Sequence, residues 1–117
     1  MFAFERLNVY SDALDFVDRV YISTSQWPKT ELYSLIDQLR RASTSIALNI
    51  AEGSSRTKKD FAHFLDLARG SCFECVAILA IAKNRKYLNE KEYQLFYETC
   101  ETLSRMISGL KHSVYER

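Results

Sequence analysis

Residues that interrupt helices are scarce in this chain, because proline occurs once, at Pro28, and glycine three times among 117 residues. A β-sandwich needs many turns built from such residues, and a disordered chain lacks the apolar groups for a core. Here 47% of the residues are hydrophobic and 26% are charged. The sequence therefore predicts an all-α protein, with residues 1–117 forming a single domain around one core.

Apolar residues recur at helical spacing in four segments. We expect helices over about residues 8–25, 30–52, 58–84 and 90–114. Pro28 should separate the first two, because its ring disfavours the helical conformation of the residue before it. Short connections make consecutive helices antiparallel neighbours, so the expected architecture is an up-down-up-down four-helix bundle.

Capping residues mark several of the helix ends. Thr30 is expected to cap the second helix, and Gly53 to end it in the left-handed conformation that glycine adopts without strain. The capping-box spacing of an acceptor followed three residues later by an acid occurs before the third helix and before the fourth. The two pairs are Thr57 with Asp60 and Asn89 with Glu92.

The third helix carries apolar residues on two opposed sides. Its core side is expected to hold Phe61, Phe64, Leu65, Ala68, Cys72, Cys75 and Leu79. The opposite side of its second half holds Phe73, Ala77, Ala80 and Ile81. A monomeric bundle covers only one of these sides, so the second side predicts an interface between copies of the chain, in a homo-oligomer.

A row of polar residues follows one face of the second helix. Gln38, Arg41, Ser45, Asn49 and Glu52 are separated by 3, 4, 4 and 3 residues. The ordinary interpretation of such a row is a solvated helix face. The short side chains of Ser45 and Asn49 have low helix propensity and favour a buried hydrogen-bonded row instead. We expect a structural role, inside the bundle or at a subunit interface.

Basic residues gather at one end of the expected bundle, where both termini and the connection after the second helix meet. They are Arg6, Arg56, Lys58, Lys59, Lys111 and Arg117, with Glu5, Asp60 and Glu116 as the nearby acids. The net charge of +1 neither requires nor excludes a polyanionic partner. This local patch is the candidate nucleic-acid contact, and the alternative is that the lysines serve only solubility.

Apart from one short motif on the fourth helix, no sequence pattern points to catalysis, and none points to a cofactor or to a metal. Cys72, Cys75 and Cys100 are an odd count within helical patterns, so we expect buried thiols rather than a disulfide framework or a zinc site. The chain has no Glu-x-x-His pair for a di-iron bundle, no glycine-rich phosphate loop and no nucleophile elbow.

No targeting signal is evident either. The longest apolar run, residues 76–82, is far shorter than a membrane-spanning helix. The first residues lack the basic and apolar regions of a secretion signal. We expect a cytoplasmic protein with no membrane partner and no small-molecule substrate.

Several strings resemble the bacterial four-helix proteins that are encoded in 23S rRNA intervening sequences, also called S23 ribosomal proteins. They are Gln38-Leu39-Arg40-Arg41-Ala42 with Ser45-Ile46, Asn49-Ile50-Ala51-Glu52-Gly53 with Arg56, and Phe61, Phe64-Leu65, Ala68, Gly70-Ser71 and Glu74. Trp27-Pro28 and Tyr87-Leu88 extend the resemblance over nearly the whole chain. Cys72-Phe73 and Tyr10 depart from the residues usual in that family.

The resemblance implies four antiparallel helices, a ring that is commonly a pentamer, and no known catalytic activity. It also implies association with RNA or with the ribosome. A related accessory protein of diversity-generating retroelements works with a reverse transcriptase, which is an alternative role. By this analogy the polar row on the second helix is structural.

One enzymatic alternative remains, a metal-independent ribonuclease resembling the helical HEPN group. The motif of that group is an arginine and a histidine separated by four to six residues. Arg105 and His112 have this spacing and would share one face of the fourth helix.

Overall fold

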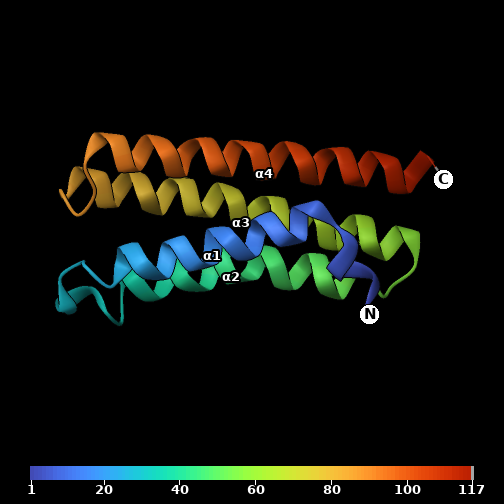
Figure 1. Ribbon diagram of the computed structural model, residues 1–117, viewed down its shortest axis with the longest axis horizontal. Helices are drawn as coiled ribbons and strands as arrows, with labels where there is room; N and C mark the ends of the chain where they lie inside the picture. The colour runs from blue at the N-terminus through green and yellow to red at the C-terminus, as the bar shows by residue number, and fades with distance from the viewer. Residues whose placement is uncertain (117) are drawn as a thin grey trace.

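The fold is built from four long helices joined by short connections. The structure is a computed structural model that describes residues 1–116. The helices are α1 (Asn8–Thr24), α2 (Leu35–Gly53), α3 (Lys58–Asn84) and α4 (Glu90–Glu116), with short 3₁₀ turns at Ala3–Arg6 and Lys29–Glu31. Each helix runs antiparallel to the one before it, and both termini lie at the end that holds the α2–α3 connection (Figure 1). The expected all-α, up-down-up-down bundle is confirmed.

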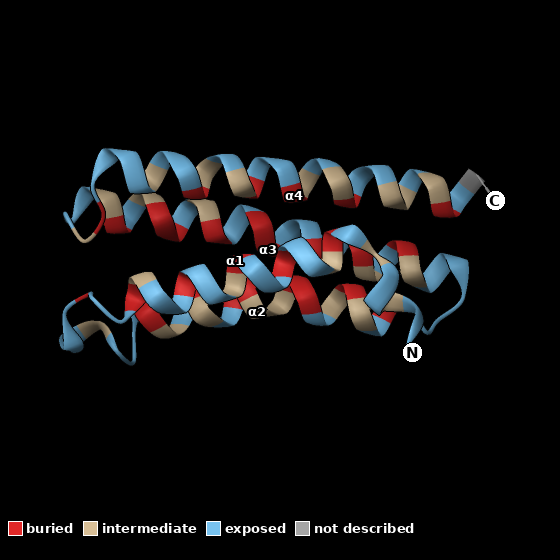
Figure 2. Ribbon diagram, in the orientation of Figure 1, coloured by how far each residue is buried: buried red, intermediate tan, exposed pale blue. Residues whose placement is uncertain are grey.

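The core lies between the facing sides of the helices, where the buried residues gather (Figure 2). Phe16, Leu39, Leu65 and Leu103, one from each helix, are almost completely buried. Burying a side chain of this kind contributes about 1.5–3 kcal/mol. The α2–α3 and α3–α4 pairs pack most extensively, whereas α1 and α4 touch only sparsely. None of the described helices is both long and apolar enough to cross a bilayer.

The start of α2 differs from the prediction. Thr30 does not cap α2 but lies in the 3₁₀ turn Lys29–Glu31, and α2 begins at Leu35. Tertiary contacts hold this connection: Tyr87 Oη donates a hydrogen bond of 2.7 Å to Glu31 Oε2, and Arg85 Nε lies 3.8 Å from the same oxygen. The hydrogen bond from Tyr87 is the main reason why the pKa of Glu31 lies below its usual value, and Arg85 adds to it. These contacts hold residues 29–31 in a 3₁₀ turn, although the local capping residues alone favour the start of an α-helix there.

The prediction for Gly53 was also wrong. Gly53 is the last residue of α2, it is buried, and no glycine has a positive φ among the described residues. A Cβ added at Gly53 would lie 2.6 Å from Phe64 Cβ and 2.9 Å from Phe61 Cδ1 of α3. Glycine is needed here because α3 passes too close for any side chain, and not because the backbone is left-handed.

The ends of α3 and α4 follow the predicted capping chemistry. Thr57 Oγ1 accepts the backbone N–H of Asp60 at 3.2 Å. Asn89 Oδ1 accepts the N–H of Glu92 at 2.7 Å, and Glu92 Oε1 accepts the N–H of Asn89 at 3.3 Å, which completes a capping box. The turn between α3 and α4 contains Lys86 at a φ of 68°, the position where glycine is usual after a helix.

Gly53 and Gly109 provide a matched test of the α2–α3 contact. We expect Gly53→Ala to destabilise the protein by about 1–3 kcal/mol, because the new methyl group overlaps Phe64. Gly109 lies in α4 with open space around its missing Cβ, so Gly109→Ala should stabilise by about 0.5–1 kcal/mol. Urea unfolding of both variants measures the difference. Equal stabilisation by the two substitutions would contradict the close approach.

Candidate functional site

The polar row on α2 has a half-buried centre that reaches α3. Ser45 Oγ accepts hydrogen bonds from Asn49 Nδ2 at 2.9 Å and from Ser71 Oγ of α3 at 3.0 Å. Asn49 Nδ2 also donates to the Ser45 carbonyl at 2.8 Å, and Ser71 Oγ lies 3.2 Å from the Leu67 carbonyl. Because a serine hydroxyl carries one proton, Ser71 donates to one of its two acceptors at a time. The result is a small polar contact between two helices that otherwise meet through apolar side chains.

The outer members of the polar row face solvent. Gln38 and Arg41 are exposed, and the Arg41 guanidinium lies 3.8 Å from Asp37. At the other end, Glu52 forms an ion pair of 2.7 Å with Arg56. The row is therefore not one continuous network. Ser71, the α3 partner of Ser45, is not among the site residues predicted from the sequence. The signal that could have identified it is a serine beside the core side of α3.

The second apolar side of α3 is open to solvent in the protomer. Phe73 is 58% exposed and Ile81 is 48% exposed, while Ala77 is exposed and Ala80 half-buried. The guanidinium of Arg69 lies 4.9 Å from the centre of the Phe73 ring. An open hollow of about 380 Å³ adjoins Phe73 between α3 and α4. Exposed apolar groups with a polar rim are typical of surfaces that bind another protein.

The basic end brings together most of the predicted nucleic-acid residues. Arg6, Arg56, Lys58 and Lys59 are exposed there and Lys111 is half-buried, whereas Arg117 lies outside the described residues. Two acids lie beside these cations in addition to those expected from the sequence. Lys111 Nζ is 2.8 Å from Asp66 Oδ1, and Arg56 is paired with Glu52.

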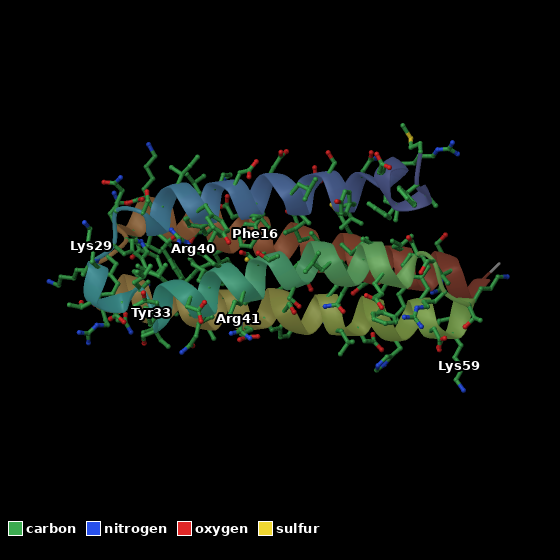
Figure 3. All side chains as sticks on the ribbon, turned by 90° about the horizontal axis from the view of Figure 1, so that it is seen from below. Phe16, Lys29, Tyr33, Arg40, Arg41 and Lys59 are labelled. Atoms are coloured by element: carbon green, nitrogen blue, oxygen red, sulfur yellow. The ribbon has the colours of Figure 1, made fainter. Side chains whose placement is uncertain are left out.

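These pairs reduce the positive charge that the basic end offers to a ligand. Arg6 and Lys59 form no ion pair with any described residue, so they are the cations most available for phosphate. Lys59 extends from the α2–α3 end of the molecule (Figure 3).

The thiols are placed for packing rather than chemistry. Cys72, Cys75 and Cys100 are free and buried, as expected from the sequence. Burial raises the pKa of Cys72 and of Cys100 to about 12, and it raises the pKa of Cys75 as well. All three are therefore protonated near neutral pH and are poor nucleophiles. Within the described part of the chain, no three His, Cys, Asp or Glu side chains gather in a way that could hold a metal ion.

Arg105 and His112 both lie on the exposed side of α4. Arg105 Nη2 reaches Thr102 Oγ1 at 3.5 Å. The hollow beside Phe73 is lined by Arg105 but not by His112.

A double-mutant cycle tests the Ser45–Ser71 contact. Ser45→Ala and Ser71→Ala should each cost about 1 kcal/mol, offset in part by the better helix propensity of alanine. The double variant should cost less than the sum by about 0.5 kcal/mol, because the first substitution already removes the shared hydrogen bond. Ser108→Ala on the exposed side of α4 is the control and should stabilise slightly, because it changes only the helix propensity. Strict additivity in urea unfolding would show that the two hydroxyls are not coupled.

Comparisons with known proteins place the chain in a family. The model of the family described as 23S rRNA-intervening sequence protein matches residues 5–109. The fold is similar to the crystal structure of a protein of unknown function from the S23 ribosomal protein family of Bacteroides thetaiotaomicron, with a TM-score of 0.81 and 19% identity, covering 89% of this chain and 95% of that one. No curated protein matches. The chain belongs to the 23S rRNA-intervening sequence protein family.

Proposed function

We propose that the protein is a non-enzymatic homo-oligomer, a pentameric ring, that associates with RNA. The observation that carries the self-association is the exposure of Phe73 and Ile81 on one side of α3. Covering such side chains is favourable by about 25 cal/mol per Å² of apolar surface removed from water. The number five comes from the family resemblance.

A closed ring also requires a second surface, because head-to-tail contacts join two different patches of the same chain. Ile22 of α1 is 70% exposed and Leu95 of α4 is 50% exposed. Both border an open hollow of about 470 Å³. This hollow shares no lining residue with the hollow beside Phe73, so the two surfaces are separate. The presence of two such surfaces supports a repeating contact.

The RNA part of the proposal is supported by the basic end. Arg6 and Lys59 are exposed there without an ion pair among the described residues. A ring would repeat these two cations around its axis, and contacts with phosphate strengthen as counterions are released from RNA. Contacts with phosphate hold the RNA in place but do not read its bases, so we expect binding with little sequence preference.

Self-association is tested by light scattering at micromolar concentration. The unmodified protein should have a mass several times the 13.6 kDa of one chain. Phe73→Glu should reduce the mass to that of one chain, because burying a carboxylate at the contact removes its hydration. Tyr115→Glu, at an exposed position near the end of α4, is the control and should leave the assembly intact. A single-chain mass for the unmodified protein at every concentration would refute the ring.

RNA association is tested by anisotropy with a fluorescent 20-nucleotide RNA of mixed sequence at 50 and 200 mM salt. Arg6→Gln with Lys59→Gln should weaken binding and reduce the slope of log affinity against log salt by about one per lost phosphate contact. Lys91→Gln, at the opposite end of the bundle, should change neither quantity. Absence of binding at 50 mM salt, where counterion release favours it most, would overturn the RNA role.

A further inference from the structure

A hollow lies along α2 as far as Asn49, bordered by Tyr21 of α1 and by the turn before α2. It is open, with a volume of about 740 Å³, and its walls include Tyr21, Tyr33, Arg40, Arg41 and Leu48. Figure 3 shows Tyr33, Arg40 and Arg41 in the half of the molecule that holds the α1–α2 connection, whereas Lys59 lies at the other end. This α1–α2 groove is therefore distinct from the basic end.

Tyr33 contributes little to the fold. The residue is 92% exposed, in the turn just before α2. An aromatic ring in water with both faces accessible is a platform on which a nucleic-acid base can stack. Leu48, further along α2, is also exposed and lines the same groove.

The charges beside Tyr33 are mainly positive. Arg40 is held by a hydrogen bond of 3.0 Å from its Nε to Thr24 Oγ1, and its guanidinium lies 4.5 Å from the centre of the Tyr21 ring. Arg40 has no ion pair within the described residues, so no carboxylate neutralises its charge. The Arg41 side chain is 80% exposed, and its contact with Asp37, at 3.8 Å, is longer than a hydrogen bond.

We propose that the α1–α2 groove binds single-stranded nucleic acid, with a base stacked on Tyr33 and the adjoining phosphates at Arg40 and Arg41. This inference rests on the proposed RNA function and adds a second contact surface to the basic end. Two arginines facing one carboxylate complement a polyanion. The exposed ring requires unstacked bases, so a single strand fits the groove and a duplex does not.

The test measures the anisotropy of fluorescein-labelled U20 RNA with the full chain at 50 and 200 mM salt. Tyr33→Ala should weaken binding about tenfold and leave the salt slope unchanged, because stacking releases no counterions. Tyr33→Phe should bind U20 as tightly as the unmodified protein does, since it keeps the aromatic ring. Arg41→Gln should weaken binding and reduce the salt slope by about one. The control variants Leu14→Ala and Lys91→Gln change exposed residues outside both the groove and the basic end, and they should have no effect.

The outcomes separate this inference from the proposed function. If U20 binds and Tyr33→Ala matches the control Leu14→Ala, the groove assignment is overturned while the RNA role stands. If U20 does not bind the unmodified protein at 50 mM salt, both the groove assignment and the proposed RNA function are wrong. If Tyr33→Ala instead lowers the mass of the assembly, the groove is a protein interface and the inference is wrong. An RNA duplex of 20 base pairs should bind the Tyr33→Ala variant and the unmodified protein equally.

Discussion

The close contact between α2 and α3 decides how the rest of the molecule is arranged. Gly53 lets Phe64 approach the end of α2, and Ser71 meets Ser45 further along the same pair of helices. Together these contacts fix the rotation of α3 about its own axis. Because that rotation is fixed, Cys72 and Leu79 enter the core and Phe73 must face outward. The exposed apolar side follows from the packing of the core and cannot be removed by turning the helix.

The sequence was sufficient wherever the determining forces are local. Apolar periodicity predicts the four helices, and the Asn89–Glu92 capping box predicts the start of α4, because its partners lie within one turn. The resemblance drawn from the polar strings of α2 agrees with the family match over residues 5–109. The sequence alone does not reveal the role of Gly53, because glycine near the end of a helix suits either a left-handed turn or a close neighbour. Only the position of Phe64, 11 residues later, distinguishes the two.

The surfaces were harder to predict because their charges pair over long separations. Lys111 and Asp66 are 45 residues apart, and no local pattern indicates that they meet. Because they pair, the basic end carries less uncompensated positive charge than the sequence suggests. Arg6 and Lys59 are then the cations most available to a ligand. The α1–α2 groove depends in the same way on Tyr21 and Arg40, which come together only through the packing of two helices. The 3₁₀ turn after Pro28 leads into Tyr33 and places it at the edge of this groove.

The central claim is that the outward side of α3 is covered by another copy of the chain in solution. Small-angle X-ray scattering over a dilution series tests it most directly, since one protomer has a Cα radius of gyration of 14.6 Å. Self-association predicts a value well above 14.6 Å at micromolar concentration, falling toward it on dilution. A radius that stays at the value of one protomer at every concentration would contradict the account.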